Sequence, residues 1–145
     1  MDPVSLTGTA VGIVSLGLTV CQSLVYYYSA FRGYSEDTQN ALKKLQNLKD
    51  ILTVLEDVLQ SHDILQTETA ATRAAKQNIM ACKGGLEQLK RLMDKCKAMP
   101  GEQKRDYINR ALYPFRRDTI KSLLQHVESL QSNLGTSMDI LQLYV

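Results

Sequence analysis

The chain has 145 residues, of which 44% are hydrophobic and 22% charged, so it is long enough to bury a core and too apolar to be a disordered segment. It contains no Trp, two Phe and three Pro, a composition that favours helix over sheet. The net charge of +2 is too small to indicate nucleic-acid binding.

The charge is unevenly distributed along the chain. Residues 36–72 hold three Lys or Arg against seven Asp or Glu, whereas residues 73–121 hold thirteen against five. An acidic block followed by a basic one is typical either of a partner-binding surface or of solvated helix faces, and the sequence leaves both open. The basic residues lack the interleaved aromatics of a single-strand binder, so anionic lipid is the better electrostatic match.

The first thirty residues are unusually free of charge. Residues 3–31 contain no Asp, Glu, Lys or Arg, although they are long enough for a helix that crosses a bilayer. Interspersed Ser, Thr and Gln lower the hydrophobicity, so the pattern lies between a core helix and a membrane helix. Gly8 and Gly12 form a GxxxG pair, which allows close helix packing either inside a bundle or between copies of the chain.

Aromatic residues mark the end of this segment. Tyr26, Tyr27 and Tyr28 are followed by Phe31 and Arg32. An aromatic cluster beside a cation is typical of a membrane interface. Partly buried tyrosines with solvated hydroxyls explain the same pattern, and taken alone the cluster favours that explanation.

A second helix follows a short turn. Gly33 closes the first helix, and Ser35, Glu36 and Asp37 are the residue types expected at a helix N-terminus. Apolar residues then recur in alternating steps of four and three, which predicts a core-facing helix ending near residues 61–63. The stripe is Ala41, Leu45, Leu48, Leu52, Leu55 and Leu59, widened by Leu42, Ile51 and Val58.

A Thr-rich stretch over residues 67–72 leads into a third helix with the same spacing. Gly84 and Gly85 interrupt it, which predicts a kink or a close contact. Its stripe is Ala75, Ile79, Cys82, Leu86, Leu89, Met93 and Cys96. Its outer side is basic, through Lys76, Lys83, Lys90, Arg91, Lys95 and Lys97.

The clearest break in the chain is the Met-Pro-Gly sequence at residues 99–101. We expect a short helix over residues 103–112, a turn at residues 113–115, and a last helix from near Asp118. The stripe of that helix is Ile120, Leu123, Val127, Leu130, Leu134, Met138 and Leu141. No segment alternates like a strand, so the sequence predicts an all-α fold, an antiparallel helical bundle of four long helices plus one short helix.

Catalytic, cofactor-binding and metal-binding sets are missing from the sequence. His62 and His126 lack a second ligand at helical spacing, and the double glycine lacks the Lys-Ser/Thr of a phosphate loop. The three cysteines are Cys21, Cys82 and Cys96, which form no CxxC pair. We therefore predict no enzyme, no cofactor and no metal, with buried thiols in a reducing cytosol.

The order of elements resembles the HeLo-like N-terminal domains of fungal STAND (NLR-type) proteins. The resemblance is carried by the opening residues 1–5 (MDPVS), the small-residue first helix, the aromatic run before Arg32 and the Leu-rich second helix. It extends to residues 113–115 (YPF) and to the pattern over residues 123–134. The sequence departs from the family at Tyr113, where the family often has Trp.

The resemblance implies a signalling-activated, pore-forming cell-death effector domain of a fungal NLR-like receptor, similar to the four-helix domain of the necroptosis pseudokinase. On that basis residues 1–145 form one HeLo-like domain at the N-terminus of a larger multidomain protein. Its implied partners are other copies of itself, anionic plasma-membrane lipids, and a C-terminal nucleotide-binding module with a repeat sensor, but no nucleic acid. The domain is expected in the cytoplasm at rest and at the plasma membrane when activated, in programmed cell death, heterokaryon incompatibility and innate immunity. The alternative is a non-toxic adaptor or regulatory helical domain that relays oligomerisation.

The first hypothesis assigns residues to three roles, and each also has an ordinary explanation in core packing or solvated surface. The membrane-inserting and oligomerisation set is Leu6, Gly8, Val11, Gly12, Ile13, Leu16, Leu18 and Leu24. The interfacial aromatics are Tyr26, Tyr27 and Tyr28, and the anionic-lipid contacts are Lys83, Lys90, Arg91 and Lys95.

Overall fold

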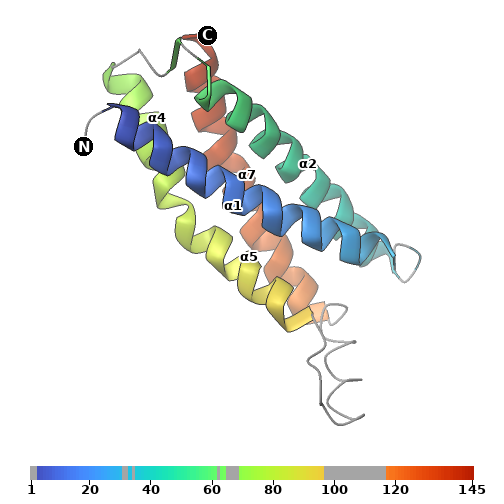
Figure 1. Ribbon diagram of the computed structural model, residues 1–145. Coiled ribbons are helices and arrows are strands. Elements are labelled where there is room, and N and C mark those ends of the chain that lie inside the picture. The colour runs from blue at the N-terminus through green and yellow to red at the C-terminus, as the bar shows by residue number, and fades with distance from the viewer. Residues whose placement is uncertain (1–2, 31–32, 34, 62, 65–68, 97–116) are drawn as a thin grey trace.

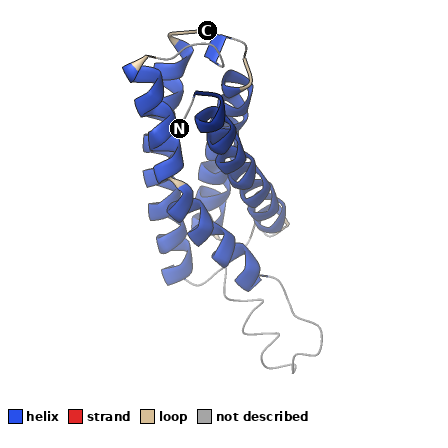
Figure 2. Cartoon of the chain, turned by 60° about the vertical axis from the view of Figure 1, so that its left-hand side comes forward, coloured by secondary structure: helices blue, strands red, loops and turns tan. Residues whose placement is uncertain are grey.

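The protein is an elongated bundle of helices (Figures 1 and 2). The computed structural model describes residues 3–30, 33, 35–61, 63–64, 69–96 and 117–145. Within those ranges no strand occurs, and the main elements are α1 (Pro3–Ser29), α2 (Glu36–Leu59), α4 (Ala70–Ala81), α5 (Lys83–Cys96) and α7 (Arg117–Gln142). The predicted all-α bundle is confirmed, while the expected short helix at residues 103–112 lies outside the described residues.

Local sequence fixes where the central helices begin. Ser35 is the N-cap of α2, and its hydroxyl accepts a hydrogen bond from the Thr38 amide at 3.1 Å. Thr69 and Thr72 form a reciprocal capping box at the start of α4, each side chain accepting from the other residue's amide. Such caps satisfy amides that have no partner inside the helix, and each stabilises a helix by about 1 kcal/mol. The start of α2 is therefore where the sequence placed it.

The bundle has four helical segments, which we call legs: α1, α2, the α4–α5 pair and α7. Consecutive legs along the chain run in opposite directions (Figure 1). The third leg is made of α4 and α5, which follow each other almost without interruption. Helices α1 and α7 each pack against α2, α4 and α5, so these two helices lie on opposite corners. The third leg breaks at Cys82, two residues before the double glycine that was predicted to mark the kink.

The core follows the predicted stripes closely. All six stripe residues of α2 are fully buried, and the stripe of α7 is buried apart from the half-buried Met138. Each fully buried aliphatic side chain contributes roughly 1.5–3 kcal/mol. The heptad spacing of the sequence therefore determines which side chains are buried. Their burial holds the legs in register.

Helix α1 uses its apolar content to build this core. Ala10, Val14, Cys21 and Leu24 are fully buried, although α1 is also long and apolar enough to cross a membrane by length and composition, with a mean hydropathy of 1.6 over its best window. The core helix of a soluble bundle passes the same test, so this property does not decide between the two settings.

The close-packing glycine of α1 is Gly17 rather than the GxxxG pair. A Cβ atom at Gly17 would lie 3.1 Å from a methyl of Leu52 and 3.1 Å from a methyl of Leu86, so the missing side chain lets three legs meet. A Cβ at Gly8 or Gly12 would meet nothing within 4 Å. The GxxxG pair is thus on an exposed face and serves no contact among the described residues.

Candidate functional site

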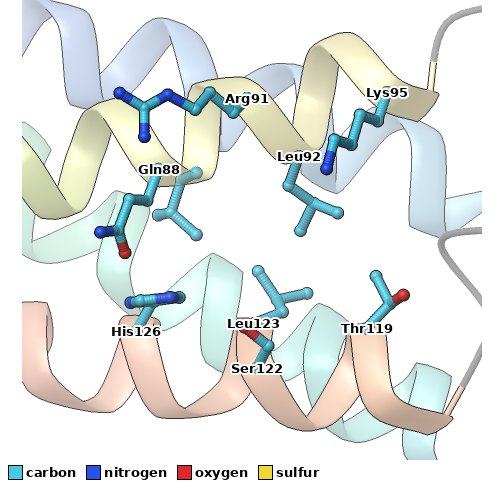
Figure 3. Close-up of a pocket in the computed structure, with 9 residues that line it drawn as sticks. Gln88, Arg91, Leu92, Lys95, Thr119, Ser122, Leu123 and His126 are labelled. Carbon is cyan, nitrogen blue, oxygen red and sulfur yellow. The ribbon is translucent and has the colours of Figure 1, made fainter.

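A pocket lies between α5 and α7 (Figure 3). Its volume is about 220 Å³. Nine residues line it: Gln88, Leu89, Arg91, Leu92, Lys95, Thr119, Ser122, Leu123 and His126.

Helical spacing brings these side chains together. On α5 the lining residues fall at steps of three and four from Gln88 to Lys95, and on α7 they do so from Thr119 to His126. Residues at such steps share one face of a helix. The pocket is therefore the seam where one face of α5 meets one face of α7.

The middle of the pocket is apolar. Leu89 and Leu123 are buried core residues, and Leu92 is half-buried beside them. In Figure 3 the side chains of Leu92 and Leu123 extend toward each other from the two helices. This leucine floor offers a surface for an apolar group.

Polar groups surround the leucine floor. In Figure 3 Gln88 extends from α5 toward His126 on α7, and the amine of Lys95 lies close to Leu92. The guanidinium of Arg91 extends along the outer side of α5, and Thr119 closes the opposite end from Gln88. Of the nine described lining residues, Arg91 and Lys95 are cationic.

The four predicted lipid-contact residues all lie on α5, and their role stays a prediction. All four are exposed, but only Arg91 and Lys95 line the pocket. Lys83 pairs with Glu87 at 3.9 Å within α5, and Lys90 lies outside the pocket lining.

The predicted inserting residues of α1 are also divided. Three of them, Leu6, Ile13 and Leu24, are buried in the bundle. Gly8 and Gly12 are exposed on another side of the helix, and the remaining residues are half-buried against the core. These last are Val11, Leu16 and Leu18. A membrane role for this set stays a prediction, and it would require the three core leucine and isoleucine side chains to leave the bundle.

The tyrosine run separates in the same way. Tyr26 is 84% exposed, Tyr27 is half-buried, and Tyr28 is fully buried. The rings of Tyr27 and Tyr28 meet edge to face with centroids 5.7 Å apart. This arrangement agrees with the alternative of partly buried packing, since two of the three rings pack on the bundle.

The described thiols are poorly suited to chemistry. Cys21 and Cys82 are free and buried. Burial raises the pKa of the Cys21 thiol to about 12, against a smaller opposing effect of Lys49, and burial also raises the pKa of Cys82. A nucleophilic cysteine needs an accessible thiolate, so both thiols act as small core residues at neutral pH. Among the described residues no group of three or more His, Cys, Asp or Glu is arranged to hold a metal ion.

Sequence reasoning missed most of the pocket. His126 was treated as isolated, and Gln88, Thr119 and Ser122 were not singled out. A usable signal was present: Thr119, Ser122 and His126 are polar residues spaced at three and four along α7, beside the apolar stripe. The sequence could not show that α5 places Gln88 and Lys95 opposite them.

The fold and the pocket define a class: a small helical-bundle domain with one amphipathic hollow between two of its legs. Comparison with known proteins gives the family. The chain belongs to the family described as pigment biosynthesis cluster protein PigL N-terminal, whose model matches residues 1–132.

A relative supports that assignment. The chain is 26% identical over 138 residues to the azaphilone pigments biosynthesis cluster protein L of Monascus ruber, which covers 92% of this chain. The chain spans only 29% of the length of that relative. No solved structure matches the chain.

The family corrects the resemblance drawn from the sequence. The match over residues 1–132 is to a pigment-cluster family, so identification as a HeLo-like domain of STAND proteins is wrong. The cell-death and pore-forming role falls with it, as do the adaptor alternative and the implied partners: further copies of the chain, anionic membrane lipids, and the nucleotide-binding and sensor modules. The error has a physical source, because Leu-rich heptads and short turns are shared by unrelated helical bundles and identify a fold class rather than a family.

Proposed function

We propose that this chain is a non-catalytic binding domain of a protein that serves pigment biosynthesis, and that it holds a small molecule in the pocket between α5 and α7. The observation that carries the proposal is the pocket's construction, a leucine floor surrounded by a few polar groups from two facing helices. Small-molecule sites are commonly built in this way, including sites between the helices of bundles.

The size of the pocket limits the ligand. A volume of about 220 Å³ is smaller than the roughly 300–1,000 Å³ of sites for drug-sized molecules. A buried apolar cavity of about 150 Å³ holds benzene. The pocket therefore suits a single substituted ring, or one end of a larger molecule whose remainder lies outside.

The absence of catalysis is part of the proposal and has two supports. The buried thiols Cys21 and Cys82 have raised pKa values, which keeps them protonated at neutral pH. In the pocket Ser122 and His126 lie on one face of α7, but none of the described lining residues is a carboxylate that would orient the imidazole for general-base work. The side chains of the pocket therefore favour binding over catalysis.

A cytoplasmic location is also part of the proposal. The described cysteines, Cys21 and Cys82, are free, which suits a reducing compartment. The predicted movement to the plasma membrane belonged to the cell-death role and is not retained.

The test fills the pocket with a large side chain. Ser122→Trp places an indole beside the leucine floor, and Ser132→Trp is the matched control at an exposed position of the same helix. Binding is followed by amide NMR shifts with two single-ring probes, benzyl alcohol and benzoate. We expect shifts in α5 and α7 for the wild type and the control, and their loss in Ser122→Trp. Absence of such shifts in the wild type for both probes contradicts the proposal.

The role in pigment formation is tested in the native host. Ser122→Trp and Ser132→Trp are introduced separately into the gene, and extracted pigment is measured by absorbance at equal protein abundance. We expect a loss of pigment with the first variant and none with the second. Unchanged pigment in a strain that lacks the gene altogether rules out the pigment role.

A further inference from the structure

We infer that the ligand of this pocket is a neutral aromatic ring with oxygen groups at two opposite positions, one bound by Thr119 and the other by Gln88 and His126. This inference rests on the proposed function and specifies the ligand of the same pocket. It follows from the polar side chains at the two ends of the leucine floor, from their lack of partners within the described chain, and from the distance between them.

One end of the pocket holds a buried hydroxyl. Thr119 closes the end away from Gln88 (Figure 3), and its side chain is only 8% exposed. Among the described residues the Thr119 hydroxyl makes no hydrogen bond. A buried hydroxyl without a partner is destabilising, and most buried polar groups in folded proteins are paired. The Thr119 hydroxyl is therefore a group that a ligand in the pocket would satisfy.

The other end holds two facing polar side chains. Gln88 extends from α5 toward His126 on α7 (Figure 3), yet neither makes a hydrogen bond or ion pair within the part of the chain that the structure describes. The seam between α4 and α7 shows the contrary arrangement, because there the Asn78 amide donates to the Ser137 hydroxyl at 2.8 Å. Facing polar groups thus pair directly where the helices close. A group placed between Gln88 and His126 can hydrogen-bond to both.

The side chains that a ligand would meet favour an uncharged oxygen. An amide, an imidazole and a hydroxyl each provide both donors and acceptors, so they suit a hydroxyl group, which also does both. A carboxylate only accepts. The two cations of the lining do not change this preference, because Lys95 already takes part in an interaction within the chain and the guanidinium of Arg91 extends along the outer side of α5.

The spacing of the two ends suits a ring with oxygen groups at opposite positions. Thr119 and His126 are seven residues apart on α7, which corresponds to about 10 Å along a helix. Leu123 lies between them in the sequence, and Leu92 extends toward it from α5 (Figure 3). A para-substituted ring with a hydrogen bond at each end has a comparable length, and its faces would pack on these two leucines. A ring with one oxygen group would satisfy only one end.

The test compares two probes of the same shape. The first is 4-hydroxybenzyl alcohol, and the second is 4-ethyltoluene, in which methyl groups replace both hydroxyls. Binding to the whole chain is measured by titration of amide NMR shifts in α5 and α7. Thr119→Val keeps the shape of the side chain and removes its hydroxyl. We expect it to weaken the alcohol about three- to tenfold, the loss of one hydrogen bond, and not to weaken 4-ethyltoluene.

The matched control is Thr136→Val. Thr136 is an exposed residue of the same helix and does not line the pocket, so its substitution should leave the affinity for both probes unchanged.

A second variant tests the other end. Gln88→Met keeps the length of the side chain without its amide, so it should also weaken 4-hydroxybenzyl alcohol about three- to tenfold and spare 4-ethyltoluene. Gln77→Met, at an exposed position of α4 outside the pocket lining, is its control. Because the two ends bind different oxygen groups, the losses should multiply in the double variant Thr119→Val/Gln88→Met.

The ligand-free chain gives an independent readout. Thr119→Val replaces a buried hydroxyl that lacks a partner by a methyl group, so the melting temperature should rise while the affinity for the alcohol falls. A lower melting temperature would mean that the protein itself satisfies the Thr119 hydroxyl, and this overturns the inference.

The remaining outcomes separate the two proposals. Equal effects of Thr119→Val on the two probes, or a loss for the alcohol that Thr136→Val reproduces, overturns the inference about the two oxygen groups and leaves the binding domain in place. Failure of both probes, together with failure of benzyl alcohol and benzoate, overturns the binding domain itself.

Discussion

The two halves of the third leg meet α7 in different ways. Helix α4 is closed against α7 by Asn78, whose amide donates to the Asn133 carbonyl oxygen at 2.9 Å and to the Ser137 hydroxyl at 2.8 Å. Between α5 and α7 the pocket remains open instead, and Gln88 lies on its rim. Both halves carry the same apolar stripe, so the stripe alone does not decide whether a seam closes. The polar residues beside the stripe differ, since Asn78 bonds to α7 and Gln88 is exposed at the pocket.

The contact between the third leg and α7 changes at the point where the third leg is interrupted. Cys82 ends α4, and Gly85 lies in the first turn of α5 against α7. A Cβ atom at Gly85 would lie 2.9 Å from a methyl of the buried Leu130, so only glycine allows the two helices to approach at this point. Beyond this contact the lining residues of α5 and α7 enclose the hollow. The comparison is thus between a closed seam before the break and an open seam after it.

The largest effect is expected at Lys76, in the closed half. This side chain is only 2% exposed, and its amine donates to the Ile64 carbonyl oxygen at 3.2 Å. Lys76→Ala removes the donor and the packing of a long aliphatic chain, so we expect the free energy of unfolding to fall by about 3 kcal/mol. Urea denaturation followed by circular dichroism measures the loss.

The matched control for this prediction lies in the open half. Lys83 is exposed, and among the described residues it pairs with Glu87 of its own helix, so Lys83→Ala should change the unfolding free energy by less than about 0.5 kcal/mol. Lys76→Met retains the packing and should recover part of the loss. Equal effects of the two alanine substitutions would show that the closed half is no more tightly built than the open half.

A smaller effect is expected from the two amides. Asn78→Ala removes two hydrogen bonds between α4 and α7 and leaves the buried Ser137 hydroxyl without that donor, so we expect a loss of about 1–2 kcal/mol. Gln88→Ala shortens an exposed side chain on the rim and should cost less than about 0.5 kcal/mol. Thermal and urea unfolding of both variants measure the difference. A loss at Gln88 as large as that at Asn78 would mean that the pocket is a closed seam in solution.

The elements and the core were predictable from the sequence because burial in a bundle follows a period. The heptads placed the stripes of α2 and α7, and the N-terminal chemistry of Ser35 placed the start of α2. The open seam was not predictable, because it depends on the separation of two helices that are joined through residues 97–116. For the same reason the spacing could not distinguish Gly17, which packs against two leucines, from Gly8 and Gly12, which meet nothing.

The functional prediction failed for a different physical reason. Absence of charge over residues 3–31 is compatible both with a helix that inserts into lipid and with one whose buried face fills a core, so it does not distinguish the two. The structure shows the second use, with Val14, Cys21 and Leu24 fully buried. The polar residues that line the pocket are ordinary surface types in the sequence, and only their facing positions on α5 and α7 bring them together.

The smallest effect is expected at the double glycine, where two neighbouring residues should respond with opposite signs. A Cβ at Gly84 meets nothing within 4 Å, so Gly84→Ala should stabilise the protein by about 1 kcal/mol through helix propensity. Gly85→Ala has the same propensity gain, but its methyl overlaps Leu130, whose surroundings in the core limit its movement. Overpacking costs about 1–3 kcal/mol, so the net change should be a loss of about 1 kcal/mol. Urea denaturation of the two variants side by side measures both signs.

A double-mutant cycle isolates the contact itself. Leu130→Ala removes the methyl that a Cβ at Gly85 would meet, so in that background Gly85→Ala should become stabilising and resemble Gly84→Ala. The interaction energy of the cycle should then be about 2 kcal/mol, while the same cycle with Gly84 should give a value near zero. If Gly85→Ala stabilises the wild-type chain as much as Gly84→Ala does, the two helices are not in close contact at Leu130. The closed and open halves would then lack a boundary at this point, and the pocket would extend toward Cys82.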